Sequence, residues 1–316
     1  MFRQYLLPLV AICAVMYYAN PAQCSVTTVQ STVVNVRLAL TMTKATYGER
    51  EPVIVRVTLA NLSKKTQRLV EADSWSLPTV EFRVSKITGE GTMPLRQSAS
   101  RLALPRDVGR EFAPGECRFD EAILDAYLPS DILEGTYAVQ AVYSVPEDLP
   151  DVWHGSITTP RATFTVVKSA PSESAGARVF AELSDLPWEP PSKTRALELA
   201  TILHGLREPS KGGLYAQYAG FKEAMAYHLA GDTTRYVSAL RDYVRDHSDV
   251  PYFGRQAKRL LISALFYELK DYAGARGIAL SLPDSYERTN WLRRCDGKLA
   301  EKQPQSSTPP ASSSAP

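Results

Sequence analysis

Residues 34–43 of the chain read VNVRLALTMT, and larger apolar side chains alternate there with polar or small ones. Val34, Val36, Leu38, Leu40 and Met42 form the apolar set. Successive side chains of a β-strand point to opposite faces of its sheet, so a period of two predicts a half-buried strand.

The same alternation recurs along the first half of the chain. It is found at residues 53–59, 80–84, 137–143 and 164–166. The intervening segments contain the Gly, Pro and Asn residues typical of turns, as in residues 47–52, 61–65 and 88–91. Several short strands separated by turns, without a helical period between them, predict an antiparallel β-sandwich over residues 25–168.

Two short segments carry a more specific resemblance. Residues 112–116, FAPGE, and residues 132–137, ILEGTY, resemble landmarks of immunoglobulin-like and fibronectin-like modules in exported bacterial proteins. The resemblance implies an immunoglobulin-like sandwich in which Tyr137 braces the preceding corner through its hydroxyl. It implies little about activity, because such sandwiches host many functions.

The pattern changes after a segment rich in Pro and Ser. Residues 169–191 are small and polar and contain several prolines, which predicts a linker. Residues 192–300 then show apolar side chains at helical spacing, with chain breaks at Gly205, Gly231 and Pro283. Asp232 and Asp271 stand where helix N-caps are expected. The spacing therefore predicts an all-α domain built of helical hairpins.

One of these hairpins resembles a known repeat. Residues 261–276, LISALFYELKDYAGAR, resemble a tetratricopeptide hairpin, with Ala264 at the helix crossing and Tyr272 beside the short turn. Residues 224–240 resemble it at lower fidelity, and their Asp232 lies 39 positions before Asp271. The resemblance implies stacked helical pairs with a groove for peptides or proteins. The alternative is a compact helical bundle whose aromatic side chains fill the core.

The two ends of the chain differ from its middle. Residues 1–24 contain a basic head, an apolar run over residues 6–18 and a small-residue exit, which predicts a secretory signal peptide. We therefore expect an exported protein, periplasmic or extracellular; an uncleaved membrane anchor is the alternative. Residues 301–316 are mostly Pro, Ser and Gln, which predicts a disordered tail.

Composition limits the function classes. A net charge of +2 argues against a nucleic-acid partner, and an apolar fraction of 44% is that of a folded protein. We find no spacing typical of a metal site, a cofactor site or a catalytic triad, so no cofactor and no catalytic residue is assigned. Beyond the leader the chain keeps Cys117 and Cys295, which predict either an interdomain disulfide or two separate thiols.

One loop of the β module is a candidate binding site. Between residues 145 and 155 it carries Asp148, Asp151, Trp153 and His154. Trp153 is suited to stacking on a sugar ring or a peptide, with the carboxylates accepting hydrogen bonds. In the alternative, Trp153 folds back over the edge of the core and the acidic residues are only solvated.

Taken together, these patterns favour an exported, non-catalytic binding or scaffolding protein with a protein partner. One alternative is a glycan-binding or inhibitor module that uses the sandwich loops and takes glycan or cell-wall material. Another is a hydrolase with an unrecognised site between the two domains.

Overall fold

We analysed a computed structural model of the chain. It describes residues 27–70, 80–88, 91–95, 109–124, 134–147, 149, 151–168, 176, 178–180, 192–208, 213–283 and 286–302. The expected signal peptide, residues 1–24, lies outside the described residues, as does the expected tail from residue 303 onward. The first two residues predicted for the tail, 301 and 302, are instead helical, because the preceding helix continues to Lys302. Within the described residues, no helix is long and apolar enough to cross a membrane.

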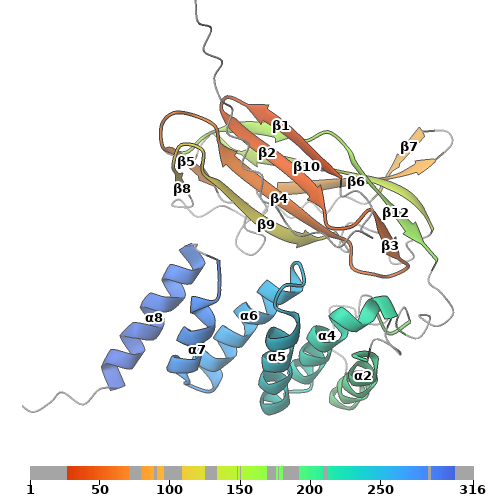
Figure 1. The fold of residues 1–316 in the computed structure, drawn as a ribbon, viewed down its shortest axis with the longest axis vertical. Coiled ribbons are helices and arrows are strands. Elements are labelled where there is room, and N and C mark those ends of the chain that lie inside the picture. The colour runs from red at the N-terminus through yellow and green to blue at the C-terminus, as the bar shows by residue number, and fades with distance from the viewer. Residues whose placement is uncertain are drawn as a thin grey trace, which may run out of the picture.

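The strands of residues 27–168, here called the β module, form two main sheets (Figure 1). The first is antiparallel, in the order β1-β2-β4-β9, and consists of β1 (Thr28–Val33), β2 (Val36–Met42), β4 (Ile54–Asn61) and β9 (Cys117–Ile123). The second has the order β3-β12-β10-β6-β7, with β11 paired to β10. It contains β3 (Thr46–Gly48), β6 (Val80–Thr88), β7 (Gly91–Pro94), β10 (Gly135–Val145), β11 (Gly155–Thr158) and β12 (Ala162–Val167). A separate pair joins β5 (Gln67–Val70) to β8 (Gly109–Phe112).

The inward faces of the two main sheets share one apolar core. In β2 the predicted alternation is confirmed, because its apolar side chains from Val36 to Met42 are buried and the residues between them are not. Tyr137 lies in this core, stacked on Phe164 with 5.4 Å between ring centroids.

The structure corrects two details of the strand predictions. Val34 is 72% exposed and lies in the turn between β1 and β2, with a φ of 42°. The turn expected from Tyr47 begins only after Gly48, because β3 pairs in parallel with β12 and buries Tyr47. The sheet is therefore not purely antiparallel.

Residues 192–302, here called the helical module, form a row of helices beneath the β module, from α2 to α8 (Figure 1). The helices are α2 (Lys193–Leu206), α4 (Ala216–Leu229), α5 (Thr233–His247), α6 (Phe253–Ser263), α7 (Tyr272–Leu280) and α8 (Tyr286–Lys302). Each packs mainly against the helix before and the helix after it in the chain. A mixed β and α architecture is thus confirmed.

Side-chain caps mark the starts of three helices. The side chains of Ser192, Asp232 and Asp271 accept hydrogen bonds from backbone N–H groups in the first turns of α2, α5 and α7. Such caps satisfy donors that a helix start leaves unpaired, which is why Asp at these positions starts a helix. Both aspartates were predicted to begin helices, and both do.

Part of the expected linker is packed. Among its described residues, Arg178–Phe180 are helical, and Val179 and Phe180 belong to the core of the helical module. The Phe180 ring lies 5.1 Å from that of Tyr215. An aromatic side chain within a polar segment thus provides an anchor that composition alone does not reveal.

The two modules meet at the buried carboxylate of Glu51. It accepts hydrogen bonds from the backbone N–H of Gly48 at 2.9 Å and from the hydroxyl of Tyr218 in α4 at 3.0 Å, and it pairs with Lys44. Burial, and next the charge of Glu51, raises the pKa of Tyr218 well above its ordinary value, so the hydroxyl keeps its proton and donates. The contact therefore links the β3–β4 connection to α4.

Further polar contacts extend this interface along β9. Asp120 pairs with Arg255 of α6, and Glu121 binds both Arg56 and the backbone N–H of Tyr252. Ile54, a strand residue, belongs to the core of the helical module. The modules therefore share both apolar and charged contacts.

We predict that Glu51→Ala lowers the free energy of unfolding by about 1–3 kcal/mol, because it leaves a buried hydroxyl and a partly buried ammonium without their acceptor. Chemical denaturation followed by circular dichroism measures the change. Glu147→Ala, at an exposed carboxylate, serves as the control and should change stability by less than about 0.5 kcal/mol. Equal stability of the two variants would contradict the role assigned to Glu51.

Candidate binding surfaces

The Trp153 loop, proposed from the sequence as a binding site, packs against the β module. The Trp153 ring is half-buried and stacks on Tyr143 with 5.6 Å between centroids. Its backbone N–H donates to the carbonyl of Arg68 at 2.8 Å. At Gly155, where φ is 137°, a Cβ atom would lie 3.1 Å from the Trp153 ring. The ring thus covers the edge of the core, as the alternative interpretation of this loop expected.

The other residues of that loop do not form a cluster with the ring. Asp151 is exposed with a φ of 57°, and exposed His154 has its Nδ1 at 2.8 Å from the carbonyl oxygen of Pro146. Asp148 lies outside the described residues. The structure therefore brings together no stacking ring and acid pair among the described residues of the loop.

The possible disulfide between Cys117 and Cys295 is not formed. Both cysteines are free; Cys117 is exposed in β9 and Cys295 is buried in α8. Cys295 belongs to the core of the helical module, where burial raises the pKa of its thiol. One thiol is exposed on a strand and the other is buried among helices, so the interpretation as two separate thiols describes the structure.

No cluster of metal-ligating side chains is present in the part of the chain that the structure describes. No group of three or more His, Cys, Asp or Glu residues is close enough there to hold an ion. The contact of His204 with the buried Glu223, at 3.0 Å, is shared with Arg207 at 3.4 Å. It joins α2 to α4 and is explained by helix packing.

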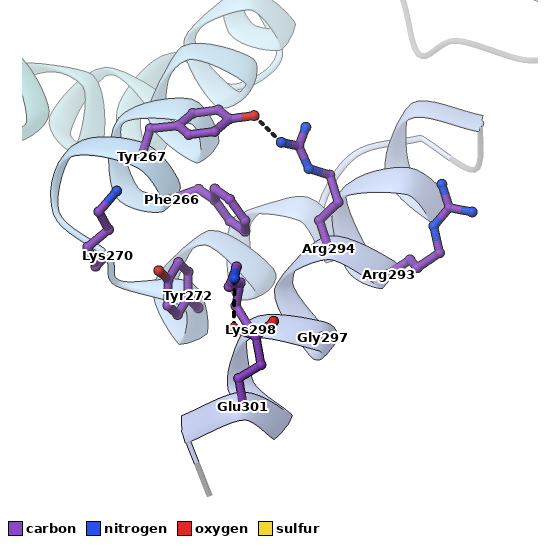
Figure 2. A pocket seen from close by; sticks show the side chains of 9 residues that line it. All are labelled: Phe266, Tyr267, Lys270, Tyr272, Arg293, Arg294, Gly297, Lys298 and Glu301. Carbon is purple, nitrogen blue, oxygen red and sulfur yellow. Dashed lines mark hydrogen bonds and ion pairs between the residues drawn. The ribbon is translucent and has the colours of Figure 1, made fainter.

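An open groove lies at the far end of the helical module, here called the α8 groove (Figure 2). Its volume is about 540 Å³. It lies where the end of the α6 segment, the start of α7 and one face of α8 meet. The lining residues are Phe266, Tyr267, Lys270, Tyr272, Arg293, Arg294, Gly297, Lys298 and Glu301.

Local backbone geometry places the aromatic side of the groove. After α6 the chain widens into a π-helical turn, Ala264–Glu268, which carries Phe266 and Tyr267. Lys270 follows with a φ of 55°, a left-handed conformation that residues other than glycine rarely adopt. The chain then reverses into α7, where Tyr272 is the first residue. Wide turns of this kind are frequent at functional sites.

Arg294 joins the two sides of the groove. Its guanidinium lies 5.2 Å from the ring centroids of both Phe266 and Tyr267, and 4.9 Å from that of Trp291. It also donates to the hydroxyl of Tyr267, as Figure 2 shows. Stacking on aromatic faces holds an arginine in one orientation without neutralising its charge.

The groove is rich in positive charge. Lys270, Arg293, Arg294 and Lys298 are cationic, and Glu301 is the one carboxylate among the nine lining residues, so four positive charges less one negative charge leave three. Glu301 pairs with Lys298 at 2.6 Å. An open surface of aromatic and cationic side chains can bind a ligand that carries negative charge, or one that combines polar and apolar groups, without any covalent chemistry.

Among these residues, only Tyr272 was singled out from the sequence, as the aromatic beside the short turn of the helical hairpin. The resemblance to a helical repeat predicted a groove somewhere between residues 192 and 300, but it did not identify the lining. One signal was present: Arg294, Gly297, Lys298 and Glu301 stand at helical spacings of three and four, and so share one face of α8. The aromatic partners follow from the π-helical turn, which the periodicity does not reveal.

Comparison with known proteins gives little further guidance. No family model and no curated protein matches the chain. A β-glucosidase from Erythrobacter marinus matches with a TM-score of 0.25 and 12% identity, over 45% of this chain and 16% of that one. A β-glucosidase from Listeria innocua, solved in complex with gluconolactone, matches with a TM-score of 0.23 and 13% identity, over 42% and 16%. The chain thus spans about one sixth of either enzyme, and TM-scores of this size identify neither its fold nor its activity.

The packing of Trp153 leads to a stability prediction. Trp153→Ala should lower the free energy of unfolding by about 1–3 kcal/mol, less than the cost for a fully buried ring because Trp153 is only half-buried. Thermal or urea denaturation measures the loss, and Trp153→Phe should recover part of it. His154→Ala is the neighbouring control and should cost less than about 0.5 kcal/mol. A Trp153→Ala variant as stable as the parent protein would contradict the packing role and favour Trp153 as a binding residue.

Proposed function

We propose that this chain is an exported, non-catalytic binding or scaffolding protein whose helical module presents the α8 groove to a protein partner. The observation that carries the proposal is the groove itself, an open hollow with aromatic side chains and Lys270 on one side and the cationic side chains of α8 on the other (Figure 2). Tyr, Phe, Trp and Arg are the residue types that dominate protein–protein contact surfaces.

The exposure of the aromatic side supports this function. Tyr267 is 45% exposed although its ring lies beside Phe266 and Trp291. A partner that covers Tyr267 removes apolar surface from water, which contributes roughly 25 cal/mol for each Å² buried. The ring is already positioned by its neighbours, so little side-chain freedom is lost on binding.

The architecture is consistent with the proposed families. Helices that pack on their sequence neighbours, with Asp232 and Asp271 as caps, support a tetratricopeptide-like array. Two sheets around one core, with Tyr137 inside, support an immunoglobulin-like β module. Export rests on the sequence of residues 1–24.

The Trp153 loop ranks below the groove as a binding site. Its ring is engaged with Tyr143, which leaves a smaller aromatic surface for a glycan. The described contacts between the modules, centred on Glu51 and Tyr218, hold the two modules together. They give no support to a hydrolase site between the domains. Neither alternative is favoured by an observation of its own.

A glycine pair provides a test that does not depend on destabilising the fold. Gly297 lines the groove within α8, and Gly277 lies exposed in α7; at each, an added Cβ would meet no atom within 4 Å. Leu is a better helix former than Gly by about 0.5–1 kcal/mol, so Gly297→Leu should fill the groove while α8 becomes slightly more stable. Gly277→Leu makes the same chemical change outside the groove.

We predict that residues 25–316 with Gly297→Leu lose the protein partners that the parent chain captures from the exported fraction of its source organism. Quantitative mass spectrometry of the captured proteins measures the loss, and Gly277→Leu should retain them. If Gly297→Leu and the parent chain capture the same partners, the groove is not the binding site. Turnover in a broad hydrolase panel would contradict the non-catalytic assignment.

A further inference from the structure

The charge and shape of the α8 groove indicate what kind of partner it binds, and this inference rests on the function proposed above. We propose that the groove binds an extended acidic segment of a protein, with carboxylates against α8 and an apolar side chain against the aromatic side. Charge, preorganisation and length each support this occupant.

Charge is the first argument. The α8 groove carries three net positive charges, whereas the whole chain carries only +2. Arg293 contacts the side-chain oxygen of Asn290, and Arg294 contacts the Tyr267 hydroxyl and aromatic rings, and these are neutral groups. Two guanidinium groups whose contacts are neutral favour carboxylates, which they can bind through two parallel hydrogen bonds.

Preorganisation is the second argument. Arg294 is held over Phe266, Tyr267 and Trp291, so its orientation is set before a ligand arrives. A cation fixed in this way loses less conformational freedom on binding than a solvated lysine does. The Tyr272 and Phe266 side chains line the same groove and provide apolar contact beside the charges.

Length is the third argument, and it separates a peptide from a small anion. Arg293 and Lys298 are five residues apart on α8, which at 1.5 Å per residue places them about 7.5 Å apart along the helix. An extended peptide covers that distance with about two residues. Cations spread along such a length match two carboxylates on one chain better than they match one isolated ion.

Selection from a displayed library of random decapeptides tests the proposal on residues 25–316, with both modules present. Enriched peptides are counted for Asp and Glu, and the best is synthesised with fluorescein beside an analogue in which Gln replaces each acidic residue. Fluorescence anisotropy then measures both dissociation constants at low and at moderate salt. We expect enrichment of Asp and Glu, at least tenfold weaker binding of the Gln analogue, and weaker binding at the higher salt concentration.

Matched charge variants locate the binding. Arg293→Glu with Lys298→Glu should weaken the acidic peptide at least tenfold. Arg161→Glu with Lys193→Glu changes the net charge equally at exposed positions outside the groove and should weaken it less than threefold. Thermal denaturation of both double variants checks that the fold is intact.

Each remaining outcome overturns the acidic-segment proposal. Selection of neutral or basic peptides that Gly297→Leu abolishes would contradict it and leave the proposed protein-binding function in place. Absence of any groove-dependent peptide would overturn the acidic-segment proposal, and partner capture by the parent chain and by Gly297→Leu then decides the protein-binding function separately. Binding of single-stranded DNA or phosphatidylglycerol vesicles through Arg293 and Lys298, without an acidic peptide, would replace the protein segment by a phosphate-bearing ligand.

Discussion

The buried carboxylate of Glu51 connects the two halves of this protein, and the position of the helical module depends on it. A carboxylate away from water is costly unless its oxygens are satisfied, and here the Gly48 backbone, Lys44 and Tyr218 satisfy them. The backbone and lysine contacts belong to the β module, and the tyrosine belongs to α4. Folding of the β3–β4 connection therefore creates an acceptor that positions one particular helix.

The rest of the helical row follows from α4. Most of its residues are buried, including Glu223 and Gly220, and both α2 and α5 pack on it. Beyond α5, each helix is placed by its predecessor, with Arg255 and Tyr252 adding contacts to β9. Among the described helices the row ends with α8, which packs against α7 on one side, and the α8 groove opens there.

The groove combines features that are unfavourable in an isolated helical domain. Lys270 has a left-handed backbone, Tyr267 is exposed, and four cationic side chains are close to one another. Each feature costs free energy, and they meet where the turn from α6 into α7 faces α8. Backbone strain and exposed apolar area tend to concentrate at functional sites. Their common location therefore supports the binding function proposed for the groove.

The amino-acid sequence alone determined the local structure wherever one physical pattern dominated. The period of two predicted β2, β4, β10 and β12, and the aspartates at 232 and 271 predicted helix starts, because side-chain alternation and capping act within a few residues. The pairing of β3 with β12, the burial of Phe180 and the separation of Cys117 from Cys295 depend on segments distant in the chain, so only the tertiary structure decided them. The same holds for the α8 groove. The helical spacing of Arg294, Gly297 and Lys298 was readable, but their meeting with Phe266 and Tyr267 required the π-helical turn and the packing of α8 against α7.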